Sequence, residues 1–258
     1  MKYTINIFQL FICIFCFLFI AHPLLSQVSP YGVFIPNGSD PSEIRSRVDA
    51  QIVDVRGLRN RDLAGASLSG VYAIRGKMNI GLSMPLVYSD FDGWLNDGLG
   101  DVALHLRYRL SRPFYAPRAI AIGADLLLKT GNYELGNSYG QYIAAPYITF
   151  VYNTEEEFLI APILRYYFGF DADPGVNRRS ELRFQLRSMV SYKNGFWTLL
   201  QPEAIFDFTG FNPTSLPLRT EIGKMFSLHW GASAEIIIYL AGKERTNYQA
   251  KINIRYLF

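Results

Sequence analysis

Apolar and polar side chains alternate strictly along several segments of the chain. From Tyr248 to Tyr256, even positions are apolar or aromatic and odd positions are polar. The same alternation runs through Val102–Leu110 and Glu181–Arg187. A period of two residues predicts β-strands with one apolar and one polar face. Long charged residues recur on the polar faces and aromatic residues mark strand ends, which is typical of a membrane barrel with an outward apolar face.

Read back from Phe258, the alternation predicts an all-β chain of about twelve strands, with ten as the alternative. The predicted strands span 47–56, 62–74, 77–87, 100–110, 118–130, 141–152, 157–168, 180–192, 196–207, 217–226, 227–240 and 247–258. An even number of strands, joined by short turns at one end and long loops at the other, is the pattern of a transmembrane antiparallel up-and-down barrel. Short turns are expected at Gly76, 153–156, 193–195 and 226–227, and long loops at 88–99, 131–140, 169–179, 208–216 and 241–246.

The first 26 residues have the layout of a secretory signal peptide. Lys2 precedes an apolar run from Ile5 to Ile20, and cleavage is expected after Ser26. A retained membrane anchor is the alternative, but the run is shorter than the roughly 20 residues of a spanning helix. No later window is long and apolar enough for such a helix, although the mean hydropathy of the chain is positive, at +0.09. A closed β-barrel is the other structure that satisfies every backbone group inside a bilayer.

Charge and cysteine content exclude several functional classes. Without residues 1–26 the chain has 24 basic and 22 acidic residues, a net charge of +2, which argues against nucleic-acid binding. Both cysteines, Cys13 and Cys16, lie in the signal peptide. The mature chain therefore has no thiol for a disulfide, a metal site or a nucleophile. No cofactor or metal-ligand cluster is expected.

Residues 27–46 differ in composition from the predicted barrel, 47–258. They contain Pro30, Pro36 and Pro41 together with several glycines, which predicts irregular structure. This leader either hangs in the periplasm or folds into the barrel as a plug, with Tyr31–Ile35 as its apolar contact.

Residues 57–131 carry a more specific resemblance. Gly98-Leu99-Gly100-Asp101 opens a strand, and Lys129-Thr130-Gly131 follows downstream. This order resembles the outer-membrane family labelled for the meta-pathway of phenol degradation, a group of transporter-like barrels. The resemblance implies passage of a small hydrophobic or aromatic molecule.

The chain ends on Arg255-Tyr256-Leu257-Phe258. This finish resembles the C-terminal signature of bacterial outer-membrane proteins. By that resemblance, Tyr256 and Phe258 form the signal that the barrel-insertion machinery recognises.

Propagating the alternation places a set of charged side chains of both signs in the lumen. Adjacent strands offer opposite charges, such as Arg183 and Arg187 beside Glu203, and enclosed charges must pair or stay hydrated. The network either filters solutes or only fills the barrel. The predicted lumen residues are Arg107, Arg109, Asp125, Lys129, Glu157, Arg165, Glu181, Arg183, Arg187, Glu203, Arg219, Glu221, Glu235, Lys251 and Arg255.

The sequence contains no legible catalytic motif, and we expect no enzyme. The two histidines of the mature chain, His105 and His229, both point into the lumen by the alternation. An enzyme would need one of them within hydrogen-bond reach of a serine and a carboxylate. Oxygen-rich residues crowd the loop 88–100, but their spacing does not match a calcium-binding loop, and a solvated loop is expected.

The sequence thus predicts a monomeric barrel in the outer membrane of a Gram-negative-type bacterium, with lipid, the insertion machinery and a small solute as partners. Its expected function is passive passage of a small, hydrophobic or aromatic solute. The alternative is a closed structural or interaction barrel that transports nothing, in which Arg183, Arg187, Glu203, Glu221 and Glu235 form a sealed layer.

Overall fold

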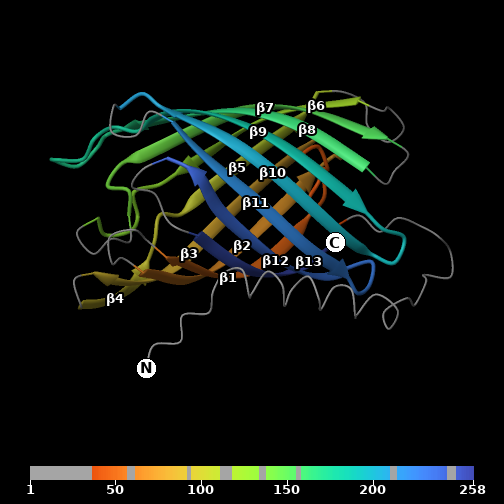
Figure 1. Cartoon of the computed structure of the whole chain (residues 1–258), viewed down its shortest axis with the longest axis horizontal. Coiled ribbons are helices and arrows are strands. Elements are labelled where there is room, and N and C mark those ends of the chain that lie inside the picture. The colour runs from red at the N-terminus through yellow and green to blue at the C-terminus, as the bar shows by residue number, and fades with distance from the viewer. Residues whose placement is uncertain are drawn as a thin grey trace.

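The structure is a computed structural model that describes residues 37–56, 62–91, 94–110, 118–133, 138–154, 158–209, 214–242 and 248–258. The predicted signal peptide, the leader up to residue 36 and Glu157 lie outside these ranges. Described residues form antiparallel strands (Figure 1): β1 (Arg47–Arg56), β2 (Asp62–Ile74), β3 (Met78–Phe91), β4 (Trp94–Leu99), β5 (Ala103–Arg109), β6 (Arg118–Leu127), β7 (Tyr142–Thr154), β8 (Phe158–Phe170), β9 (Ser180–Ser191), β10 (Phe196–Asp207), β11 (Thr214–Met225), β12 (Trp230–Ala241) and β13 (Tyr248–Leu257).

The strands close into a barrel of twelve staves, where a stave is one strand position in the ring. Apart from β4 and β5, consecutive strands pair with each other, and β1 pairs with β13 to complete the ring. β4 and β5 together make one stave, because both pair with β3: Leu99 lies opposite Leu86, and Ala103 lies opposite Ser83. Between these two pairs, three residues on one side face two on β3, so Gly100–Val102 form a β-bulge between the two halves of the stave. The predicted count of twelve strands is confirmed at the level of staves.

Most strand boundaries lie close to those predicted from the alternation, and one predicted loop is wrong. Residues 88–99 were expected to form a long loop, but β3 continues to Phe91 and β4 begins at Trp94. The two strands form a hairpin that extends the sheet beyond the ring (Figure 1). The acidic residues of this segment broke the apolar alternation, and alternation was the only signal used to find strands.

The two ends of the barrel differ. Arg47 pairs with Leu257, so β1 begins and β13 finishes at the same end, which we call the terminal end. The connections β2–β3, β9–β10 and β11–β12 lie there and are short. The opposite end, which we call the loop end, carries the longer connections β6–β7 and β8–β9. This asymmetry confirms the predicted short-turn and long-loop pattern.

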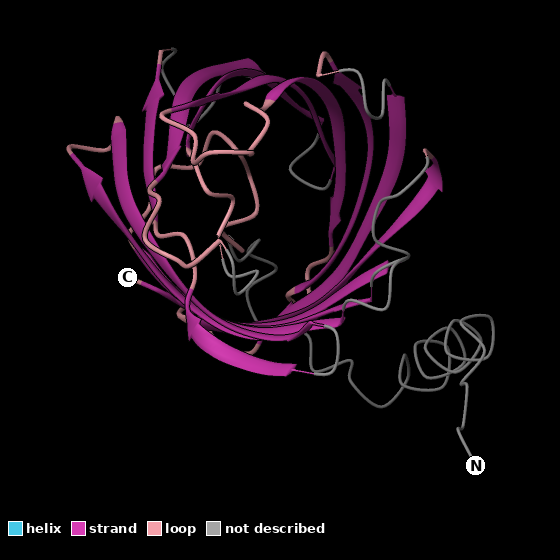
Figure 2. Cartoon of the chain, turned by 90° about the vertical axis from the view of Figure 1, so that its left-hand side faces the viewer, coloured by secondary structure: helices cyan, strands magenta, loops and turns pink. Residues whose placement is uncertain are grey.

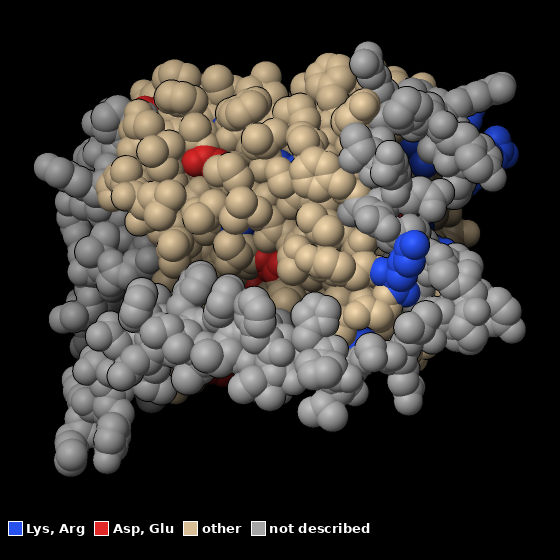
Figure 3. Space-filling model, turned by 45° about the vertical axis from the view of Figure 1, so that its right-hand side comes forward, with Lys and Arg blue, Asp and Glu red and all other residues tan. Residues whose placement is uncertain are grey.

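Apolar side chains cover the outside of the barrel. Exposed residues at even positions include Leu68, Ile80, Phe150, Phe184 and Ile252. On the side drawn in Figure 3, few Lys, Arg, Asp or Glu side chains break the described surface. Soluble proteins rarely expose a continuous apolar surface, and a lipid-facing band accounts for it. Among the described residues, no helix is long and apolar enough to cross a bilayer.

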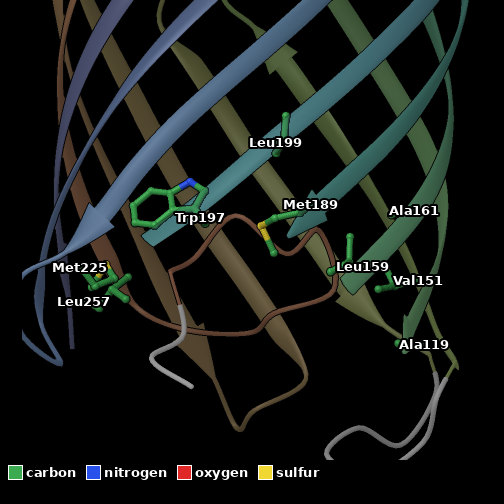
Figure 4. Close-up of a cluster of buried hydrophobic side chains, with 9 residues drawn as sticks. All are labelled: Ala119, Val151, Leu159, Ala161, Met189, Trp197, Leu199, Met225 and Leu257. Atoms are coloured by element: carbon green, nitrogen blue, oxygen red, sulfur yellow. The ribbon is translucent and has the colours of Figure 1, made fainter. Parts of the chain in front are cut away.

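Inside the terminal end, one group of inward side chains is apolar. They come from the strand ends shown in Figure 4 and include Met189, Trp197, Leu199, Met225 and Leu257. Trp197 fits because Gly223 faces it: a Cβ on Gly223 would lie 2.1 Å from the indole. We call this group the apolar shelf.

Loop segments lie within the ring of strands when the barrel is viewed from the loop end (Figure 2). The connections β6–β7 and β8–β9 bind each other: the Asp173 amide donates to the Gly140 carbonyl at 2.8 Å, and the Arg179 amide donates to Gln141 Oε1 at 2.9 Å. Lys129 Nζ lies 2.9 Å from Asp173 Oδ1. The two loops therefore form one unit.

The segments that carried the family resemblance contact each other. Thr130 Oγ1 donates to the Gly100 carbonyl and accepts from the Val102 amide, both at 2.9 Å. Asp101 is buried, and its carboxylate accepts from the amides of Gly131 at 3.1 Å and Tyr139 at 2.7 Å. These residues tie the β6–β7 loop to the bulge between β4 and β5.

Candidate functional site

A cavity of about 150 Å³ lies in the lumen between the apolar shelf and the loops. Its wall is almost entirely polar and includes five arginines but one carboxylate. The lining residues are Pro41, Arg107, Tyr147, Ile163, Arg165, Tyr167, Arg183, Gln185, Arg187, Glu203 and Arg219. Ten of them project inward from strands of the barrel, and Pro41 comes from the segment that precedes β1.

Three of the cavity arginines are paired with carboxylates. Arg165 lies 2.7 Å from Asp125, and Arg183 lies 2.7 Å from Glu181 and 3.2 Å from Glu203. The two guanidinium groups also lie over aromatic rings, Arg165 at 4.6 Å from Tyr147 and Arg183 at 4.4 Å from Tyr167. Arg219 is 3.6 Å from Glu235, which Lys251 also contacts at 3.0 Å.

Arg107 and Arg187 are different, because neither forms an ion pair with a described carboxylate. Arg107 Nε donates to the Tyr147 hydroxyl at 3.1 Å, and Arg187 Nε donates to Gln201 Oε1 at 2.9 Å. Each also donates to a main-chain carbonyl of the segment before β1. Arg187 reaches Ser39 at 2.8 Å, and Arg107 reaches Glu43 at 3.5 Å. Their close polar contacts are therefore with neutral groups, and the charges of Asp125, Glu221 and Glu235 act on them from beyond ion-pair distance.

Residues 37–46 lie inside the terminal end of the barrel. Asn37, Ser39 and Ser42 are buried, and Asn37 Nδ2 contacts Met189 Sδ of the apolar shelf at 3.4 Å. The apolar contact expected at Tyr31–Ile35 lies outside the described residues.

A buried ion triad holds this segment. Asp49 lies 2.6 Å from Arg255 and 2.9 Å from Arg47. Arg255 Nη1 donates to the Asn37 carbonyl and to Ser39 Oγ, and Arg47 Nη1 donates to the Gly38 carbonyl. Gly38 has a φ of +71°, a conformation that glycine adopts without strain and that turns the chain into the lumen.

The remaining predicted lumen residues lie around this centre or at the rims. Glu221 accepts from Trp197 Nε1 at 3.3 Å. Arg109 donates to the Gly76 carbonyl at the terminal rim, at 2.7 Å. Lys129 follows β6 at the loop end, and its hydrogen bond with Asp173 raises its pKa above the ordinary value. Arg109 and Lys129 are therefore not part of the cavity wall.

The two histidines have different positions. His229 lies in the exposed β11–β12 turn, where its Nδ1 contacts the Leu257 carbonyl at 2.8 Å, so its predicted lumenal position is wrong. The alternation was carried through a turn, where it has no meaning. His105 lies on β5 with Nε2 at 2.7 Å from Ser83 Oγ and Nδ1 at 2.8 Å from Asp125 Oδ1. His105 thus meets the geometric condition set for an enzyme.

Tyr256 and Phe258 belong to an aromatic group at the terminal rim. Their ring centroids are 4.7 Å apart, and Trp230 packs 4.8 Å from Tyr256. Recognition of this group by the insertion machinery remains a prediction.

Sequence reasoning missed several residues of the site. Asp49 and Arg47 were overlooked because apolar and polar residues alternate only weakly along β1. Both charged residues nevertheless stand at odd positions, as the predicted lumen residues do. Tyr147 and Tyr167 were not counted because only charged residues were collected. Pro41 and Ser39 offered no sequence signal, since their place depends on how the segment enters the barrel. The described residues contain no cluster of three or more potential metal ligands.

The structure is similar to solved outer membrane proteins. The COG4313 outer membrane channel from Pseudomonas putida F1 has a TM-score of 0.70 at 14% identity, over 86% of this chain and 99% of that one. The KdgM porin has a TM-score of 0.58 at 11% identity, over 82% and 99%. The NanC porin has a TM-score of 0.58 at 9% identity, over 82% and 98%. No protein-family model and no curated protein matches the sequence.

These likenesses are likenesses of fold. Together with the closed ring of twelve staves and the apolar exterior, they establish the chain as a bacterial outer-membrane β-barrel. The similar structures are described as channels and porins.

Proposed function

We propose that the barrel is a channel for passive passage of a small solute. The observation that carries the proposal is the cavity of about 150 Å³, in which water-sized space remains beside the ion pairs that cross the lumen. The predicted sealed layer of Arg183, Arg187, Glu203, Glu221 and Glu235 would leave no such space. The similarity to channels and porins supports the same function.

The lining supports a solute that has both an aromatic ring and a negative charge. Arg107 and Arg187 donate to main-chain carbonyls of the leader, and no described carboxylate lies within ion-pair distance of either guanidinium group. Guanidinium groups bind carboxylates and sulfonates through charge-assisted hydrogen bonds. Tyr147, Tyr167 and Ile163 supply apolar surface on the same wall. The aromatic part of the proposal also rests on the family resemblance around residues 98–131.

We also propose that the leader is the plug of this channel. Residues 37–46 cover the cavity from the terminal end, and Pro41 lines it directly. The main-chain carbonyls of Ser39 and Glu43 take hydrogen bonds that a negatively charged solute would otherwise take. Removing the leader therefore both opens the path and exposes the two arginines.

The test is solute passage through the refolded chain in liposomes. Benzenesulfonate and phenyltrimethylammonium share a ring and carry opposite permanent charges, and arabinose serves as the uncharged small sugar. We expect benzenesulfonate to pass at least tenfold faster than phenyltrimethylammonium, and deletion of residues 27–46 to speed its passage. In the deletion chain, Arg187→Gln should reduce the preference for the anion.

Different outcomes of these passage measurements contradict different parts of the proposal. Equal passage of the two aromatic ions contradicts the solute class but leaves the channel. Unchanged passage after the deletion contradicts the plug. If nothing passes through either chain while both keep the electrophoretic mobility of a folded barrel, the closed structural or interaction barrel is the better description.

A further inference from the structure

Three side chains on adjacent staves form a continuous hydrogen-bonded chain. Ser83 on β3 lies 2.7 Å from His105 Nε2 on β5, and His105 Nδ1 lies 2.8 Å from Asp125 Oδ1 on β6. The register brings them together: His105 pairs directly with Asp125, and Ser83 pairs with Ala103, two residues before the histidine. Serine, histidine and carboxylate within hydrogen-bond reach in this order is the geometry of an activated nucleophile.

The three side chains face the lumen. Their sequence neighbours Leu82, Met84, Leu104 and Leu106 are exposed on the outside of the barrel, so the alternation turns Ser83 and His105 inward. The His105 side chain keeps 34% of its surface exposed, and Asp125 keeps 16%. A small molecule that enters the lumen can therefore reach the imidazole and the serine hydroxyl.

The carboxylate is fixed from its other side. Asp125 Oδ2 lies 2.7 Å from Arg165 Nη1, which leaves Oδ1 for the histidine. An ionised carboxylate accepts the Nδ1 proton of His105, and the Nε2 lone pair is then directed at the Ser83 hydroxyl. Arg165 is itself held over Tyr147. The orientation of the imidazole therefore depends on groups from three further strands.

We propose that Ser83 is a nucleophile activated by His105, and that the lumen hydrolyses small carboxylic esters. Ser83 Oγ bonds to the ester carbonyl carbon while His105 Nε2 takes the serine proton. The bond to the alcohol oxygen breaks, and the alcohol leaves with that proton. Water then attacks the acyl-serine and gives a proton to His105. The acid is released, and Ser83 recovers its hydrogen from His105.

Arg107 is the cation placed to offset the charge that develops on the carbonyl oxygen. It follows His105 by two residues on β5 and therefore shares its inward face. It forms no ion pair with a described carboxylate. This activity goes beyond the proposed channel, because a reagent has to reach the lumen but does not have to cross it.

The test uses diisopropyl fluorophosphate, which transfers its phosphoryl group to an activated serine with loss of fluoride. The refolded full chain is treated with the reagent, and the modified residue is located by peptide mass. Ser67 is the internal control, because it also contacts an inward polar side chain, Gln51 at 3.4 Å, but contacts no imidazole of the described residues. We expect modification at Ser83 and none at Ser67.

Substitutions distinguish activation of Ser83 by His105 from a purely structural role of these residues. His105→Gln keeps a hydrogen-bonding side chain that cannot take a proton, and it should slow modification by about 100-fold or more. Ser83→Ala should abolish modification, and Ser67→Ala should leave its rate unchanged. Asp125→Asn should lower the maximal rate while leaving the half-saturating concentration of reagent near that of the unsubstituted chain.

A second reagent covers the case in which the first is too large for the lumen. p-Nitrophenyl acetate should release a burst of p-nitrophenol and leave an acetyl group on Ser83. Reaction of Ser83 no faster than Ser67 with either reagent would overturn the proposal. So would equal rates in the unsubstituted chain and His105→Gln. Because no solute has to cross the barrel, these outcomes do not depend on the channel.

Discussion

Asp49 illustrates how one residue can control one end of this barrel. Its carboxylate binds two arginines, the half-buried Arg47 and the buried Arg255, and through them the carbonyls of Asn37 and Gly38. Removing one partner from a buried ion pair leaves an uncompensated charge, which is costlier than losing a surface pair. The stability of the terminal end and the position of the leader therefore depend on the same carboxylate.

We predict that Asp49→Asn lowers the free energy of unfolding by about 3 kcal/mol. Asp54→Asn is the matched control, since Asp54 lies on the same strand but forms an exposed pair with Arg56. It should cost less than about 1 kcal/mol. Urea unfolding of both variants in lipid vesicles measures the difference. Equal effects would show that burial of the triad contributes nothing.

At the scale of elements, the loop end is held by contacts between loops and a β-bulge. Asp101 sits in the bulge of the β4–β5 stave and accepts two amides of the β6–β7 loop. That loop in turn binds the β8–β9 loop. The two loops should therefore be released together, although they are far apart in sequence.

We predict that Asp101→Ala frees the β6–β7 loop while the barrel stays folded. The substitution leaves the amides of Gly131 and Tyr139 without their acceptor, and an unpaired buried donor costs roughly 1–3 kcal/mol. Limited proteolysis should cut between residues 128 and 141 at least tenfold faster than in the unsubstituted chain. Asp97→Ala, on the exposed side of β4, is the control and should change nothing. Unchanged cleavage in Asp101→Ala would contradict this role.

At the scale of the whole molecule, the proposed plug links opening of the barrel to whether the leader stays in the lumen. Burial raises the pKa of Glu43 above its ordinary value of 4.5, and nearby Asp40 raises it further, whereas Arg45 acts in the opposite direction. Between 4.5 and the raised pKa, the docked leader holds more protons than the released one. Docking therefore weakens as the pH rises through this window.

We predict that the passage of benzenesulfonate through the intact chain, measured over a pH series, becomes faster as the pH rises from 4.5 through the raised pKa of Glu43. Glu43→Gln should lose this part of the pH dependence. The difference between the pH profiles of Glu43→Gln and the unsubstituted chain isolates the effect of Glu43, because all other groups titrate in both chains. Asp54→Asn, an exposed carboxylate outside the leader, should behave as the unsubstituted chain does. Identical pH profiles for Glu43→Gln and the unsubstituted chain would exclude Glu43 as the titrating group.

The barrel could be predicted from the amino-acid sequence, because the residues of a membrane-spanning strand alternate between its lipid-facing and lumenal sides. Leu104, Leu106 and Tyr108 alternate with His105 and Arg107, and this period alone gives the strand and its inward side. The method failed where the period is absent or interrupted. It gave a loop for the acidic hairpin of β3 and β4, and it placed His229 in the lumen by carrying the alternation through a turn.

The tertiary structure decided what the inward residues do, since partners come from different strands and registers. Alternation places Ser83, His105 and Asp125 on inward faces, but only the pairing of β3, β5 and β6 brings them within hydrogen-bond reach. Likewise, the sequence left open where the leader goes. Its contacts with Arg187 and Arg255 depend on side chains about 150 and 220 residues away in the chain, and no local pattern encodes a contact across such a separation.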